Sequence, residues 1–144
     1  MIDDAKWIQI NQVAADWKEA LSIACTPLII HGAAEPNYLQ GIIKNTQSWG
    51  PYYLIAPGIA MPHARPEQGT IYNQITLTTL KQPVVFGHED CDPVWLLMTV
   101  CATQSDDHIR LIQYIAELID NPLLLDEIRC AKTNDDVLRL LNSY

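Results

Sequence analysis

The chain has 144 residues, 49% hydrophobic and 18% charged, a composition that fits a compact domain with a sizeable core and excludes intrinsic disorder. The formal net charge of −8 repels nucleic acid and anionic membranes, so neither is an expected partner. No apolar run approaches the roughly 20 residues that span a bilayer, and the acidic first residues do not have the pattern of a signal peptide. We therefore expect a cytoplasmic protein with no direct membrane insertion.

The first 50 residues predict one strand and two helices. Residues 7–10 have the composition of a short strand, and Asp16-x-x-Glu19 has the form of a capping pair that opens a helix. That helix ends at His31-Gly32, and Pro27 inside it predicts a kink or an earlier end. Pro36 is placed to open a second helix, which ends before the glycine at position 50.

The middle of the chain predicts strands. Residues 52–56 and 74–80 have strand composition, and we expect a turn at 81–82 followed by a short edge strand at 83–86, where a proline is tolerated. The nearly continuous apolar run 94–102 is typical of a strand buried on both faces. Sheets covered by helices on both sides belong to the α/β class, which is the fold class we predict.

Three helices complete the chain, each with its own start signal. Ser105 is expected to cap the first, Asn121-Pro122 opens the second, and Thr133-x-x-Asp136 opens the third. No repeat, linker or low-complexity segment interrupts the sequence. We therefore expect one α/β domain over residues 1–144.

The proline-flanked segment around His63 is the strongest candidate for chemistry. Met61 and Arg65 each precede a proline and should be extended, and period-two alternation then places both on the side of His63. Neutral histidine is a usable nucleophile near pH 7, and the arginine fork fits a phosphate. The pattern favours a phosphorylated His63 with Arg65 as a phosphoryl clamp. The alternative is an ordinary surface histidine in a proline-rich loop.

His108 is the second candidate, because it falls at the start of the helix that follows the buried strand. A helix N-terminus presents unpaired amide donors and favours anions. A histidine there can donate an N–H to a phosphoryl oxygen at the edge of the sheet. The alternative is a half-buried histidine that packs against Leu111 and Ile112.

Metal-ligand residue types occur together in residues 88–92, but they are consecutive and no second cluster has complementary spacing. The four cysteines contain no CxxC pair, and most lie in or beside apolar runs. We therefore expect buried reduced thiols and neither a metal nor a cofactor.

The segment Ala56-Pro57-Gly58-Ile59-Ala60-Met61-Pro62-His63 resembles the active-site segment of the mannitol/fructose-type enzyme IIA family (type 2) of the bacterial phosphoenolpyruvate-dependent sugar phosphotransferase system (PTS). Asp92-Pro93-Val94, the apolar strand after it and His108 match the same family. The longer string at 50–58 and 61–69 is similar to the ascorbate-specific branch. The resemblance extends from about Trp7 to Leu141.

This resemblance implies a three-layer fold in which helices flank both faces of a mixed β-sheet. It implies that His63 accepts a phosphoryl group from the phosphocarrier protein HPr, as phosphohistidine, and passes it to enzyme IIB. Enzyme IIB would serve a membrane enzyme IIC that takes up ascorbate or a related sugar. His108 would stabilise the phosphoryl group by hydrogen bonding, with no cofactor and no metal.

One departure from the family pattern concerns arginine. Many mannitol- and fructose-type members carry an Arg-Glu pair upstream of the active-site segment, whereas the corresponding positions here are near Gln47 and Ser48. Arg65 is the candidate to replace the missing charge. This departure favours the ascorbate-like branch over a close mannitol or fructose relationship.

A regulatory role is the alternative to sugar transport. Members of the wider family act as proteins whose phosphorylation state controls a transporter, kinase or transcription factor. The ascorbate-like string favours the transport role, and binding of a small enzyme IIB would discriminate between the two.

Overall fold

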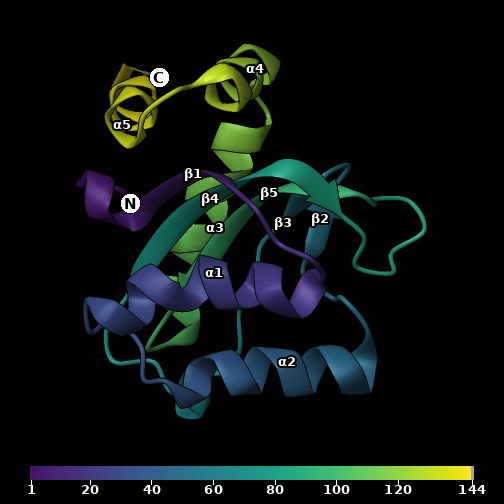
Figure 1. The fold of residues 1–144 in the computed structure, drawn as a ribbon. Coiled ribbons are helices and arrows are strands. Elements are labelled where there is room, and N and C mark those ends of the chain that lie inside the picture. Colours follow the sequence, from purple (N-terminus) through teal and green to yellow (C-terminus); the bar gives the residue numbers. More distant parts are fainter. Residues whose placement is uncertain (144) are drawn as a thin grey trace.

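The computed structural model describes residues 1–143. Its five strands form one mixed sheet. Helices lie around this sheet (Figure 1). The strands are β1 (Ile8–Gln12), β2 (Leu54–Ala56), β3 (Ile59–Ala60), β4 (Gln74–Val84) and β5 (Val94–Cys101). Their spatial order is β1-β4-β5-β3-β2. The pairs β1–β4 and β3–β5 are parallel, whereas β4–β5 and β2–β3 are antiparallel.

Helices lie on both faces of this sheet, as the sequence predicted. They are α1 (Trp17–Ile30), α2 (Asn37–Trp49), α3 (Ser105–Ile119), α4 (Pro122–Cys130) and α5 (Asn134–Ser143), with short 3-10 turns η1 (Ala5–Trp7) and η2 (Pro66–Gln68). Helix α1 packs against β4 and β5, with α2 beside it, and α3 packs against β5 from the opposite face (Figure 1). Within residues 1–143, no helix combines the length and the apolar character that a membrane crossing requires.

Strand β5 is the centre of the core. All eight of its residues are buried, as expected for a strand covered on both faces, and Leu96, Leu97 and Met98 are almost completely inaccessible to solvent. Burying an aliphatic side chain of this size contributes about 1.5–3 kcal/mol. Strand β5 is therefore a rigid support for the segments that follow it and its neighbours.

The predicted helix starts are confirmed where a side chain caps the helix. The Asp16 carboxylate accepts a hydrogen bond from the backbone N–H of Glu19 at 2.9 Å, and the Glu19 carboxylate accepts one from the Ala15 N–H at 3.1 Å. Asn121 and Thr133 cap α4 and α5 in the same way, through their side-chain oxygens. Each cap of this kind contributes about 1 kcal/mol.

Pro27 neither ends nor shortens α1, which continues to Ile30. A proline inside a helix leaves the carbonyl four residues earlier without its usual N–H donor. Here that carbonyl belongs to Ile23, and the Gln9 side-chain amide on β1 donates a hydrogen bond to it at 2.7 Å. The contact from the neighbouring strand compensates for the bond that the proline removes.

The expected turn at 81–82 and the separate edge strand at 83–86 are wrong. Strand β4 continues through both positions to Val84, which pairs with Val94 of β5. The register shifts between Thr79 and Val84, and this irregularity accommodates a proline without ending the strand. The segment that was expected to form a turn and a separate strand therefore forms the irregular end of one long strand.

Candidate active site

His63 and His108 come together because they follow adjacent parallel strands. His63 lies three residues after the end of β3, and His108 lies in the first turn of α3, which follows β5. Parallel neighbours end at the same edge of a sheet, and the crevice at that edge is a common place for a site. The centroids of the two imidazole rings are 4.8 Å apart, and the ring planes are inclined at 60°.

The loop that carries His63 is fixed by backbone hydrogen bonds on both sides. The Met61 N–H donates to the Tyr53 carbonyl at 2.8 Å, and the Val100 N–H on β5 donates to the Pro62 carbonyl at 2.9 Å. Arg65 is extended, with φ −72° and ψ 150°, as its place before a proline predicts. The loop is therefore held at a defined distance from the end of β5.

The imidazole of His63 is held in one tautomer. Its Nδ1 atom lies 2.8 Å from the carbonyl oxygen of Met61. A carbonyl oxygen can only accept a hydrogen bond, so Nδ1 carries the proton and donates. In the neutral ring Nε2 then has a free lone pair, which is the requirement for a nucleophile.

Both histidines favour the neutral state. Burial lowers the pKa of His63 below its usual value, against the opposing effect of the hydrogen bond to the Met61 carbonyl. Burial also lowers the pKa of His108, and the adjacent His63 lowers it further. Two neutral imidazoles can thus face one another, one as a nucleophile and the other as a hydrogen-bond donor.

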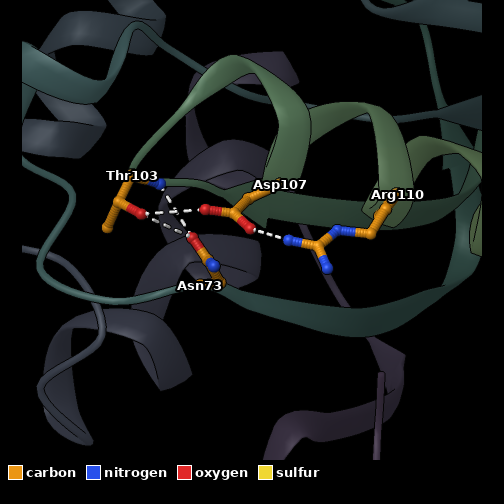
Figure 2. Close-up of polar contacts among 4 residues, drawn as sticks. All are labelled: Asn73, Thr103, Asp107 and Arg110. Carbon is orange, nitrogen blue, oxygen red and sulfur yellow. Dashed lines mark hydrogen bonds and ion pairs between the residues drawn. The ribbon is translucent and has the colours of Figure 1, made fainter.

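The start of α3 is held to the start of β4 by the polar network in Figure 2. The backbone N–H and the hydroxyl of Thr103 lie 2.8 and 3.1 Å from the side-chain oxygen of Asn73. The same hydroxyl lies 3.2 Å from the Asp107 carboxylate, which also pairs with Arg110. Hydrogen bonds to the Asp107 carboxylate, first from the Asn73 side chain and then from Arg110 and Thr103, lower the pKa of Asp107. Asp107 directly precedes His108, so the network fixes the position of His108 at the start of α3.

Ser105 is not the N-cap of α3, contrary to the sequence prediction. It is the first helical residue, and Gln104 occupies the cap position without a side-chain hydrogen bond to the helix. The Thr103–Asn73 contacts anchor the chain just before the helix instead. This anchor depends on a residue 30 positions away in the sequence, so the local capping pattern could not indicate it.

A pocket of about 560 Å³ opens beside the two histidines, and its walls are mostly apolar. His63, His108 and Arg65 all contribute to its lining. The other lining residues come mainly from the end of α2, the His63 loop and the start of α3: Asn45, Trp49, Tyr52, Ala64, Pro66, Ala102, Gln104, Ser105 and Ile109. The pocket is large enough for a phosphoryl group together with part of a donor molecule.

Arg65 lies at the rim of this pocket and is exposed. Its guanidinium carbon lies 5.5 Å from the centroid of the Trp49 ring, within the range of a cation–π contact. Trp49 is the last residue of α2, directly after Gln47 and Ser48. The Arg65 guanidinium therefore lies next to the turn of α2 that corresponds to the position of the arginine in many mannitol- and fructose-type members.

The polar segment 87–93 contacts its own backbone. The Nδ1 atom of His88 accepts hydrogen bonds from the N–H groups of Asp90 and Cys91, each at 3.2 Å. The Asp92 carboxylate accepts three backbone N–H groups from residues 86–88, each at 2.7 Å. Nowhere in residues 1–143 do three His, Cys, Asp or Glu side chains gather in a way that could hold a metal ion.

The four cysteines are free thiols, and Cys25, Cys91 and Cys101 are buried whereas Cys130 is exposed. Burial raises the pKa of the Cys25 and Cys101 thiols to about 12. These two thiols are therefore protonated and unreactive at neutral pH.

Two tyrosine hydroxyl groups contact the backbone beside His63. The Tyr52 hydroxyl donates a hydrogen bond to the His63 carbonyl, and the Tyr38 hydroxyl accepts one from the Ala64 N–H at 3.0 Å. Tyr38 lies in α2 and is completely buried. No spacing in the sequence indicates these contacts, because they depend on how α2 and β2 pack beside the loop.

Comparison with known proteins identifies close relatives over the full length of the chain. The chain is 55% identical over 142 residues to the phosphotransferase IIA component SgcA of Escherichia coli (strain K12), covering 99% of both. It is 38% identical over 138 residues to the ascorbate-specific PTS EIIA component of the same strain, covering 95% of this chain and 90% of the relative.

Solved structures share the same fold. A PTS IIA protein, PtxA, from Streptococcus mutans has a TM-score of 0.88 at 39% identity, covering 94% of this chain and 86% of PtxA. The mannitol enzyme IIA in its complex with phosphorylated enzyme IIB, from Escherichia coli, has a TM-score of 0.84 at 23% identity, covering 98% and 97%. The family model described as "Phosphoenolpyruvate-dependent sugar phosphotransferase system, EIIA 2" matches residues 1–144. The chain thus belongs to the type 2 EIIA family of the phosphoenolpyruvate-dependent sugar phosphotransferase system, a family of phosphotransferase components.

Proposed function

We propose that His63 carries a phosphoryl group on Nε2, taking it from phosphorylated HPr and passing it to a cognate enzyme IIB. The observation that supports this most directly is the hydrogen bond from Nδ1 of His63 to the Met61 carbonyl at 2.8 Å. It leaves the Nε2 lone pair free in a ring that lines the pocket beside His108. Membership of the EIIA family supplies the class of reaction.

In the transfer step Nε2 of His63 attacks phosphorus while the bond from phosphorus to the donor nitrogen of HPr breaks. The donor histidine leaves with the electron pair of that bond. The His63 ring gains positive charge as Nε2 forms the new bond, and the Nδ1–H donation to Met61 stabilises this charge. The reverse sequence, with enzyme IIB as acceptor, discharges His63. Positioning and charge stabilisation supply the catalysis, so no cofactor is required.

His108 and Arg65 are proposed to hold the phosphoryl oxygens. The His108 ring is 4.8 Å from the His63 ring, centroid to centroid, so a group on Nε2 would lie within reach of its N–H. Arg65 lies at the rim of the same pocket, over Trp49. Its position beside the last turn of α2 supports the proposal that it substitutes for the arginine that many family members carry near residues 47 and 48.

The proposed pathway is the uptake of ascorbate or a related sugar. The support comes from relatives that are named as ascorbate-specific EIIA components and are 38% identical. The relative that is 55% identical, SgcA, has no sugar in its name. Partner enzyme IIB is proposed on the strength of the family, one member of which has been solved as a complex with phosphorylated enzyme IIB.

The central test is phosphorylation in a purified system. The chain is incubated with phosphoenolpyruvate, enzyme I and HPr, and we expect it to gain one acid-labile phosphate. His63→Ala should abolish the labelling because it removes the attacking nitrogen. His31→Ala is a matched control, since His31 lies at the end of α1 and is not among the pocket residues, and it should be labelled normally. Undiminished labelling of the His63→Ala protein would refute the assignment.

Variants at the two supporting residues should slow the transfer without removing the acceptor. His108→Ala should reduce the transfer rate about 100-fold, the usual effect of removing one donor to a developing charge. Arg65→Gln should reduce it about ten-fold, because it removes a charge-assisted hydrogen bond at an exposed position. Rapid-quench measurement of the first turnover gives both rates. Wild-type rates in both variants would exclude these roles.

The cognate partner can be identified by offering the phosphorylated chain two acceptors. We expect rapid transfer to a small ascorbate-type enzyme IIB and slow transfer to a mannitol-type enzyme IIB. Rapid transfer to the mannitol-type protein alone would contradict the ascorbate assignment. Transfer to neither would contradict the transport role and favour a regulatory one.

A further inference from the structure

The peptide group between His63 and Ala64 is bound at both ends by tyrosine hydroxyl groups. The Tyr52 hydroxyl donates a hydrogen bond to the His63 carbonyl oxygen. On the other side of the same peptide group, the Ala64 N–H donates to the Tyr38 hydroxyl oxygen at 3.0 Å. The two tyrosines come from different parts of the chain, since Tyr38 lies in α2 and Tyr52 lies two residues before the start of β2.

The Tyr38 hydroxyl connects the His63 loop to the central strand. It donates to the Val100 carbonyl at 2.6 Å while it accepts from Ala64, so its donor and one acceptor position are both used. The Val100 N–H in turn donates to the Pro62 carbonyl. Tyr38 is completely buried, so water cannot replace the hydroxyl group if it is removed.

Tyr52 contacts both the backbone and the side chain of His63. Its ring lies edge-on to the imidazole, with centroids 5.3 Å apart, and it also packs against the Tyr53 ring at 4.9 Å. Its side chain is partly exposed at the pocket, with 38% of the residue accessible to solvent. Tyr52 therefore limits movement of the nucleophile from the solvent side, as Tyr38 does from the interior.

We propose that Tyr38 and Tyr52 are positioning residues that hold the His63–Ala64 peptide group from both ends and so fix the direction of the His63 Nε2 lone pair. Rotation of this peptide group would move the Cα–Cβ bond of His63 and break the Nδ1–H contact with Met61. In-line transfer requires an aligned nucleophile, and a misplacement of about 1 Å can reduce a rate about 100-fold. The role of the two tyrosines in catalysis rests on the proposed phosphoryl relay.

The test uses phenylalanine variants, which retain each ring and remove only the hydroxyl group. We expect Tyr38→Phe to slow single-turnover phosphorylation of His63 about 100-fold and Tyr52→Phe to slow it about ten-fold, with little change in KM for phosphorylated HPr. The Tyr38 effect is larger because it removes a partner from the Val100 carbonyl, in a buried contact, and from the partly buried Ala64 N–H. Tyr53→Phe is the matched control, because the buried Tyr53 hydroxyl contacts Thr46 at 2.9 Å and not the loop.

A second measurement separates positioning from general loss of stability. ¹⁵N NMR of the His63 side chain should report a protonated Nδ1 and a bare Nε2 in the wild type and in Tyr53→Phe. In Tyr38→Phe and Tyr52→Phe we expect a mixture of both tautomers, because the contact with Met61 is weakened. The rate of the double variant should be reduced by less than the product of the two single fold reductions. Both hydroxyl groups restrain the same peptide group, so their effects are not independent.

The outcomes distinguish the positioning role of Tyr38 and Tyr52 from the phosphoryl relay on which it rests. If wild-type protein is not labelled, the relay is wrong, and the tautomer measurement still tests whether the hydroxyl groups orient the ring. If wild-type protein is labelled and both variants match Tyr53→Phe in rate and tautomer, the positioning role of Tyr38 and Tyr52 is overturned. If Tyr38→Phe does not fold, Tyr52→Phe decides the matter, because the hydrogen bond to the His63 carbonyl that it removes is exposed to solvent.

Discussion

Burial and a single carbonyl contact act in opposite directions on the His63 imidazole. Burial disfavours the charged ring and lowers its pKa, whereas the Met61 carbonyl favours a ring that carries a proton on Nδ1. Burial has the larger effect, so the ring stays neutral at pH 7. The carbonyl contact then determines which nitrogen is free, and the two effects together produce a neutral ring with a bare Nε2.

This balance predicts the pH dependence of phosphorylation. Protonation of Nε2 removes the lone pair, so the labelling rate should fall at acidic pH, with a midpoint below the ordinary histidine value of 6.5. The measurement is the initial labelling rate by preformed phosphorylated HPr across the acidic range, accompanied by an NMR titration of His63. A midpoint above 6.5 in the titration would contradict the inferred effect of burial. The stability of phosphorylated HPr in each buffer is the control.

At the scale of elements, Gly58 determines how β3 joins the sheet. It adopts φ +79° in the turn between β2 and β3, and a side chain there would place Cβ 2.7 Å from Cδ1 of Trp95. The Gly58 N–H donates to the Cys91 carbonyl at 2.8 Å, and its own carbonyl accepts from the Trp95 N–H at 2.9 Å. The absence of a side chain lets the turn lie directly against the start of β5.

Gly58→Ala should therefore destabilise the protein more than an alanine at a glycine of equal φ in open surroundings. Gly32 has the same φ of +79°, and a Cβ at that position would have no neighbouring atom within 4 Å, so Gly32→Ala measures backbone strain alone. We expect a loss of about 1–2 kcal/mol for Gly32→Ala from the left-handed conformation. Gly58→Ala should cost about 1–3 kcal/mol more, the usual range for overpacking, by urea denaturation. Equal losses would show that Trp95 moves aside freely.

The sequence was sufficient for elements that depend on local signals. Side-chain caps such as Asp16 and the uninterrupted apolar run of β5 identified helices and the central strand. It failed where a distant partner decides the outcome. Gln9 on β1 lets α1 continue past Pro27, and pairing with β5 extends β4 to Val84. Strand β3, of two residues, is too short to produce a recognisable pattern of its own.

The same division applies to the candidate site. Flanking prolines and helix position singled out His63 and His108, and the structure brings their rings together. The contacts of Tyr38 and Tyr52 could not be predicted. Hydrogen bonds from hydroxyl groups to the backbone depend on the strand order and produce no repeating pattern in the sequence. Arg65 was expected beside His63, and its contact with Trp49 at the end of α2 is a feature that only the packing reveals.

For the whole molecule, the neutral histidines link stability to pH. The pKa values of His63 and His108 are lower in the folded chain than the ordinary value of 6.5. As the pH falls through 6.5, the unfolded chain binds protons before the folded chain does, so the free energy of unfolding decreases. The decrease stops once the pH is below both folded-state values.

Urea unfolding at about pH 7.5 and about pH 5.5 should show this loss of stability. In the variant with His63→Gln and His108→Gln, the loss should be smaller, because two groups that take up protons on unfolding are absent. An equal loss in the variant would mean that other groups cause the pH dependence. Circular dichroism at both pH values shows whether each protein is folded at the start.

The sheet combines long central strands with a short edge. Strands β4 and β5 have 11 and 8 residues, whereas β2 and β3 have 3 and 2. Short strands with few ladder bonds detach at a lower free-energy cost than long central ones, so local opening should begin at this edge. His63 lies three residues after β3, and such an opening would carry it away from His108 while β4 and β5 remained paired. The lifetime of a phosphorylated His63 in water would then follow the opening rate of this edge, as hydrogen exchange reports it, and not the global stability of the chain.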